Sequence, residues 1–187
     1  MADAADIAET LLQLADAEPE AELVTNLRLQ KLLYYAQGWS LAMRGVPLFE
    51  EPIEAWDLGP VIPPVYRRYK RFGSRAINDG QTPTAPRVDA ETFRFVERIW
   101  QTHRRHSASA LVGMTHREAP WRDADRGSAR NDRGVEIPVA AMKAYFDERL
   151  AAAAIPGIDL EHVWEAEAEF ARGGGRSLAA IRAERVG

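Results

Sequence analysis

The fold of this chain is decided by residues 25–73, TNLRLQKLLYYAQGWSLAMRGVPLFEEPIEAWDLGPVIPPVYRRYKRFG. The first half of this stretch is typical of a helix: Thr25 is a good N-cap residue, and apolar side chains recur at helical spacing over residues 29–43. Gly45 then provides a C-terminal stop signal. Because the apolar stripe is so wide, we expect this helix to lie in the centre of the core.

The second half of the stretch predicts a turn and a second helix. Residues 53–56 alternate apolar with polar or small side chains, which predicts a short strand that Gly59 ends. Two prolines then suit a helix start, where a missing amide costs nothing. The apolar face of this helix consists of Val65, Tyr66, Tyr69 and Phe72, and its other side carries Arg67, Arg68, Lys70, Arg71 and Arg75.

The remaining sequence predicts mostly helices. We expect them at residues 4–17, around residues 93–100, after the capping residue Ser107, and from Ile137 onward. Residues 123–136 are polar and interrupted by glycine, so we predict an exposed loop there. The fold class is therefore mainly α (α+β): a compact helical domain with a small β-sheet element near residues 53–58 and 75–79.

We expect one domain over residues 1–155 and a C-terminal helix with a flexible tail over residues 156–187. A Pro-Gly pair at residues 156–157 separates the two parts, and three consecutive glycines at residues 173–175 predict a joint within the tail.

Composition narrows the class of protein. The chain has 187 residues, of which 46% are hydrophobic, and it contains no cysteine, which excludes disulfides and thiolate zinc sites. No stretch approaches the ~20 apolar residues that span a bilayer, and no signal peptide is visible, so we expect a cytoplasmic protein without a membrane partner. The net charge of −4 argues against nucleic-acid binding through the whole surface.

Charge is unevenly distributed. Residues 67–75 are basic, whereas residues 157–169 are acidic, and such asymmetry can steer a charged partner or reflect solvated helix faces. The cations of residues 67–75, flanked by Tyr66 and Tyr69, are the best candidate for a contact surface. Base stacking with phosphate contacts is the alternative use of such a surface.

Histidines and aromatic residues leave several interpretations open. His103 and His106 could share a helix face and bind a metal, but the adjacent arginines would repel a cation, so we predict no metal site. His116 could be structural, face a partner, or act in catalysis with a nearby aspartate. Tyr35 lies in an aromatic band that packs into the core or presents one ring to a partner.

Three motifs resemble one known family. LRLQKLLYYAQGW (residues 27–39), PLFEEPIEAWDLGPVIPPVY (residues 47–66) and THREAPW (residues 115–121) resemble, in that order, the Panacea domain of bacterial and phage antitoxins. The resemblance covers roughly residues 7–150 and is greatest to SocA-type members.

The resemblance implies a non-enzymatic antitoxin without cofactors, which binds a cognate protein toxin and delivers it to the ClpXP protease. A DNA-binding autoregulator of a toxin–antitoxin operon is the alternative, and a His-dependent hydrolase is a more distant one. We predict no catalytic residue. The predicted partner-binding residues are Tyr35, Tyr66, Arg67, Arg68, Tyr69, Arg71 and His116.

Overall fold

The computed structural model describes residues 2–18, 20–77, 87–127 and 134–153. In chain order its elements are α1 (Ala4–Asp16), α2 (Asn26–Met43), β1 (Glu54–Trp56), β2 (Gly59–Val61), α3 (Pro63–Tyr69), the 3-10 helix η1 (Lys70–Phe72), α4 (Ala90–His103), α5 (Ala108–Thr115), α6 (Ala119–Gly127), β3 (Val135–Glu136) and α7 (Val139–Ala153). The predicted mainly helical class with a small sheet is confirmed. The predicted C-terminal helix and tail, residues 156–187, lie outside the described residues.

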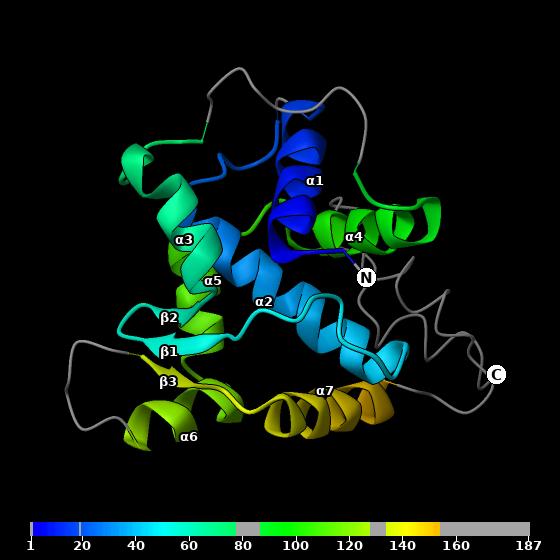
Figure 1. The fold of residues 1–187 in the computed structure, drawn as a ribbon, viewed down its shortest axis with the longest axis vertical. Helices are drawn as coiled ribbons and strands as arrows, with labels where there is room; N and C mark the ends of the chain where they lie inside the picture. Colours follow the sequence, from blue (N-terminus) through cyan, green and yellow to red (C-terminus); the bar gives the residue numbers. More distant parts are fainter. Residues whose placement is uncertain (1, 19, 78–86, 128–133, 154–187) are drawn as a thin grey trace, which may run out of the picture.

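Helix α2 crosses the middle of the molecule, with α1 and α4 on one side of it and α7 on the other (Figure 1). Its N-cap residue is Thr25, whose hydroxyl oxygen accepts a hydrogen bond from the amide of Arg28 at 3.2 Å. Almost the whole circumference of the helix is buried. The prediction of a central helix is therefore confirmed. None of the helices in the described ranges is long and apolar enough to cross a bilayer.

Helix α7 packs closely against α2 at a glycine. A Cβ atom on Gly38 would lie 2.1 Å from Cε2 of Phe146, so only glycine leaves room for this ring. Phe146 is fully buried and packs edge-on against Tyr34 and Trp39. Helix α7 therefore approaches α2 closely at Gly38.

The sheet differs in part from the prediction. Its strand order is β2-β1-β3, all antiparallel, with Ala55 of β1 opposite Pro60 of β2 and Val135 of β3. Of the second strand predicted near residues 75–79, residues 75–77 form a single bridge between Thr25 and Ala76, and residues 78–79 lie outside the described residues. The third strand lies within residues 123–136, which we predicted to be a loop, and α6 also continues into that stretch as far as Gly127.

Candidate partner-binding surface and the polar core behind it

Helix α3 and the following turn present a group of cations to solvent. Arg67, Lys70 and Arg71 follow the spacing that puts side chains on one helix face, and Arg75 comes directly after the turn. All four residues are exposed, and we call them the basic surface. The guanidinium of Arg71 lies over the ring of Phe72, 5.0 Å from its centroid. The sequence prediction of a cationic face on this helix is therefore supported by the exposure of these side chains.

Arg68 points to a different partner. Its guanidinium forms an ion pair with Glu9 of α1, whose side chain is only 7% exposed, and Arg87 approaches the same carboxylate at 3.2 Å. The two cations compensate a carboxylate that would otherwise be costly to bury. Arg68 therefore links α3 to α1 and we leave it out of the basic surface, but its side chain is 47% exposed, and its predicted role in partner binding stays a prediction.

Tyr66 lies beside the basic surface and packs against the β1–β2 hairpin. Its ring meets that of Trp56 edge-on, with centroids 4.9 Å apart, and the indole nitrogen of Trp56 donates to Glu54 at 2.8 Å. Both rings are half-buried. At the tip of the hairpin, Leu58 is 56% exposed. Sequence reasoning did not single out Trp56 or Leu58 as contact residues; the signal was their position directly before Gly59.

Two of the predicted contact residues are buried. Tyr69 is 4% exposed and Tyr35 is 2% exposed, so neither presents its ring to a partner in this structure. The hydroxyl of Tyr35 donates to Glu118 at 2.9 Å, and its ring stacks on His103 at 4.5 Å. Burial raises the pKa of both Tyr35 and Glu118. Tyr35 thus belongs to a polar core, which corrects its assignment to the surface.

His116 lies behind the hairpin and not on the basic surface. Its ring stacks on Trp121 with centroids 4.0 Å apart and planes nearly parallel, and the indole of Trp121 donates to the carbonyl of Trp56 at 3.0 Å. Burial and the nearby charge of Lys31 lower the pKa of His116. Among the described residues no hydroxyl is hydrogen-bonded to this imidazole, which is the contact that an activated nucleophile needs. The ring of His116 thus packs on Trp121, and its role in partner binding stays a prediction.

Polar side chains of α2 hold the hairpin and α3 in place. The ammonium of Lys31 donates to the carbonyl of Pro60 at 3.0 Å, and the amide oxygen of Gln30 accepts from the backbone of Ile62 at 2.9 Å. Asn26 donates to the carbonyl of Tyr66 at 3.0 Å. Each bond satisfies a backbone group in the hairpin or at one end of the short helix α3.

Lys31 is the most constrained of these residues. Burial lowers the pKa of its ammonium to about 7. A Cβ atom on Gly59 would lie 2.7 Å from Cε of Lys31 and 2.8 Å from the hydroxyl of Thr115, and Gly59 itself has a φ of +100°. The three sequence motifs therefore meet here: the first supplies Lys31, the second Gly59 and the third Thr115.

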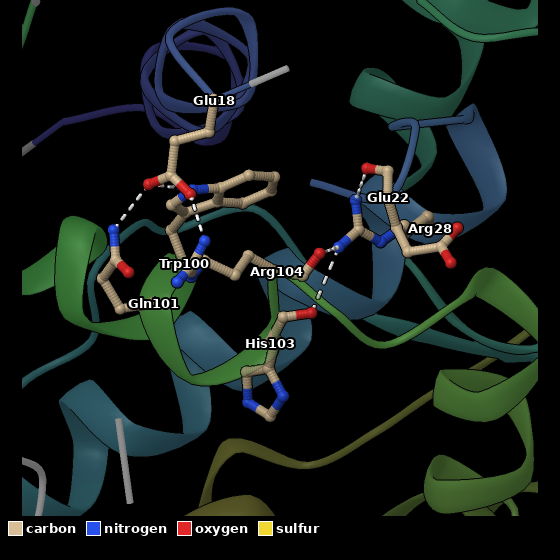
Figure 2. A network of polar contacts seen from close by, with 7 residues as sticks. All are labelled: Glu18, Glu22, Arg28, Trp100, Gln101, His103 and Arg104. Carbon is tan, nitrogen blue, oxygen red and sulfur yellow. Dashed lines mark hydrogen bonds and ion pairs between the residues drawn. The ribbon is translucent and has the colours of Figure 1, made fainter. Parts of the chain in front are cut away.

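A second polar cluster fixes the loop before α2 to the end of α4. Figure 2 shows the guanidinium of Arg28 donating to the carbonyl oxygens of Glu22, His103 and Arg104. Its Nε also donates to the carbonyl of His106 at 2.8 Å. Burial lowers the pKa of Arg28 to about 10. One side chain thus satisfies four backbone carbonyls.

Glu18 completes this cluster from the other side of α4. Its carboxylate accepts from Gln101 at 2.7 Å and from Trp100 at 3.3 Å, and it forms an ion pair with Arg104 at 2.7 Å (Figure 2). All of these bonds join segments far apart in sequence. The cluster therefore stabilises the tertiary arrangement of α1, α2 and α4.

The rings of His103 and His106, which raised the question of a metal site, have centroids 5.5 Å apart. His103 is buried rather than solvated, and neither ring nitrogen has a hydrogen-bond partner among the described residues. Burial, with His106 and Arg28 nearby, lowers the pKa of His103 to about 3, so its imidazole is neutral. Within the described ranges no group of three or more His, Cys, Asp or Glu residues has the geometry to hold a metal ion.

Comparisons with known proteins agree with this arrangement of motifs. Residues 29–122 match the family model described as "Antitoxin SocA-like, Panacea domain". Antitoxin SocA of Caulobacter vibrioides (strain NA1000 / CB15N) is 34% identical over 145 residues, which cover 71% of this chain and 77% of that protein. No solved structure gives a significant match. The chain belongs to the family of SocA-like antitoxins with a Panacea domain.

Proposed function

We propose that this antitoxin binds a cognate protein toxin directly and delivers the bound toxin to the ClpXP protease as an adaptor. Family membership supports the antitoxin activity, and the resemblance to SocA-type members supports the adaptor step. The observation that carries direct binding is the exposed basic surface on α3, flanked by the Trp56–Tyr66 pair. Arginine, tyrosine and tryptophan are the residue types enriched where proteins bind one another.

The proposed mechanism needs no chemical step by the antitoxin. An adaptor holds its cargo with one surface and the unfoldase with another, and tethering raises the effective concentration of the cargo at the protease. We assign the protein no catalytic residue and no cofactor. Because ClpXP is a cytoplasmic protease, the proposal also places the antitoxin in the cytoplasm.

The decisive experiment uses the protein encoded by the reading frame next to the antitoxin gene. Co-expression should yield a complex that co-purifies, and purified ClpXP with ATP should degrade that protein faster when the antitoxin is present. Stable binding without accelerated degradation would support direct toxin binding and contradict the adaptor step. Failure of the two proteins to associate would overturn direct binding.

DNA binding is the second candidate, because the same basic surface could contact phosphates. Such binding would weaken steeply as salt concentration rises. A mobility-shift assay with the promoter region of the operon tests it. Sequence-specific binding that Arg67→Glu and Arg71→Glu abolish together would favour the autoregulator.

A further inference from the structure

We propose that the toxin docks on a composite surface whose apolar centre is Leu58, Trp56 and Tyr66, and whose rim is the basic surface. The contact element of the toxin would be an acidic segment that carries at least one large apolar side chain. This inference rests on the proposed function and specifies both the site and the chemistry of its partner. We call the combined area the docking surface.

The apolar centre differs from the other exposed apolar residues. Among the described residues, the large apolar side chains that are well exposed are Leu23, Val46, Leu58 and Val139. Leu58 sits at the tip of the turn that carries Trp56, and the Trp56 ring in turn packs on Tyr66 of the basic helix. An aliphatic tip beside two half-buried aromatic rings resembles the centre of a protein interface.

The docking surface is held in place before any partner arrives. Hydrogen bonds from Lys31 to Pro60 and from Trp121 to Trp56 hold the hairpin. The side chain of Asn26 joins α3 to α2, and the ion pair of Arg68 joins α3 to α1. Ordering a loop on binding costs free energy, and these contacts remove that cost. The polar core described above therefore acts as the support of the docking surface.

The charge of the rim indicates the charge of the partner. The rim consists of the four exposed cations of the basic surface. Of the carboxylates nearby, Glu9 forms ion pairs with Arg68 and Arg87, and Glu54 accepts a hydrogen bond from the indole of Trp56. Asp57 at the turn and Glu136, opposite Glu54 in the sheet, are exposed acids near the hairpin, and the four cations outnumber these two in the part of the chain that the structure describes. A protein with complementary acids is steered to such a surface. An acidic protein is favoured over nucleic acid because Leu58 offers no hydrogen bond to a base or phosphate and the chain has a net charge of −4.

The test uses full-length variants and the toxin encoded by the neighbouring reading frame. One variant is Leu58→Asp, with Leu23→Asp as its control, since Leu23 is 72% exposed in the loop before α2. The second combines Arg67→Glu with Arg71→Glu, and its control combines Arg94→Glu with Arg105→Glu, which makes the same change of charge at exposed positions elsewhere. Thermal melting confirms that each variant remains folded.

Calorimetry at low and high salt measures the binding of each variant. We expect Leu58→Asp to weaken binding at least about tenfold, as for a central contact residue. The Arg67/Arg71 variant should weaken binding and also flatten its salt dependence, because rim charges act through long-range attraction. Both controls should bind within about twofold of the wild type. The two variants probe the surface independently, so if one of them fails to fold, the other still decides the result.

Each contrary outcome has a distinct meaning. If the wild type does not bind the toxin, the proposed function is wrong and the docking surface is wrong with it. If the wild type binds and both surface variants bind equally well, only the docking surface is wrong. Tighter toxin binding by the Arg67/Arg71 variant would also overturn the proposed docking surface. It would indicate that the chain's own acidic residues 157–169 bind the basic surface in place of the toxin. Loss of specific DNA binding in the same variant would overturn the docking surface in favour of a nucleic-acid site.

Discussion

The most informative residues are charged side chains that lie inside the protein. Arg28 and Lys31 are both fully buried on α2, and each donates to backbone carbonyls of segments distant in sequence. Helical periodicity predicts polar residues on the outer face, so the sequence could not reveal that these two point inward. Their carbonyl partners belong to loops whose position depends on the complete fold. The same limit applies to Arg68, because its partner Glu9 is 59 residues away.

Tyr35 and Tyr66 show how far residue-level prediction could go. Both are aromatic residues in helices, and both were predicted to contact a partner. Tyr66 is half-buried at the hairpin, whereas Tyr35 is buried with its hydroxyl on Glu118. Glu118 lies 83 residues from Tyr35, and no local pattern signals this pair. Neither residue type nor position on this helix decided exposure, since Tyr69, on the same short helix as Tyr66, is also buried.

A pH dependence of stability follows from His103. Its folded pKa of about 3 lies below the unfolded value of ~6.5, so the unfolded chain binds more protons between these limits. The contribution of His103 is therefore fully present above pH 6.5 and is lost as pH falls. We expect the unfolding free energy of the wild type to drop by about 1.6 kcal/mol more than that of His103→Leu between pH 6.5 and pH 5.

Urea denaturation at a series of pH values measures this difference. Glu118 acts in the opposite direction over part of this range. Burial raises the pKa of its carboxyl group, so the folded state binds a proton more readily than the unfolded chain and is stabilised as the pH falls. Comparison with His103→Leu separates the two contributions, since Glu118 is common to both proteins. Parallel pH curves for the two proteins would show that folding leaves the pKa of His103 unchanged.

At the scale of elements, local signals predicted the helices well and the sheet only in part. Capping residues, prolines and apolar spacing define α2, α3 and α5, and the structure has N-caps at the predicted Thr25 and Ser107. Strand β3 could not be predicted because it has only two residues, in a polar stretch, and its partner β1 lies about 80 residues earlier. A strand of this length is defined by its pairing and not by its own sequence.

The packing of α7 on α2 gives a prediction at Gly38. Alanine favours a helix over glycine by about 1 kcal/mol, but a Cβ atom here would lie 2.1 Å from Phe146. We expect Gly38→Ala to lower the unfolding free energy by about 1–3 kcal/mol, the usual cost of overpacking. Chemical denaturation measures the change.

Gly113 provides the matched control for Gly38. It also lies inside a helix, α5, yet a Cβ atom there would meet only an arginine nitrogen at 3.9 Å. Gly113→Ala should therefore stabilise the protein by up to about 1 kcal/mol. Combining Gly38→Ala with Phe146→Leu should cost less than the sum of the two single changes, since a smaller side chain leaves room for the methyl group. Strict additivity would mean that Phe146 moves away without strain.

For the whole molecule, the distribution of charge matters more than its total. The net charge is −4, yet residues 67–75 expose five cations, of which Arg68 is paired with Glu9. An acidic protein with a compact basic surface can attract an acidic partner there and repel it elsewhere, which favours one orientation of approach. The sequence showed both the total and the basic stretch, and the fold was needed to show that Arg68, although exposed, is paired with Glu9.

A truncation tests whether toxin binding and delivery use separate parts of the chain. The proposed docking surface lies within residues 56–75, whereas residues 173–175 are consecutive glycines followed by Arg176, Arg182 and Arg185. We expect a protein ending at Ala171 to bind the toxin within about twofold of the full chain, because none of the docking contacts is removed. Delivery to ClpXP should fail, since an adaptor needs a second contact away from its cargo.

Calorimetry with the toxin and a degradation assay with purified ClpXP measure the two properties of the truncated protein separately. A chain of full length with Arg176, Arg182 and Arg185 replaced by serine is the matched variant, because it keeps the length and removes only the charge. If it also binds normally and fails in delivery, the cations after the glycines contact the unfoldase. Toxin degradation at the full rate by the truncated protein would instead place the unfoldase contact before residue 172. Loss of toxin binding in that protein would contradict the docking surface itself, because the toxin would then need residues beyond Ala171.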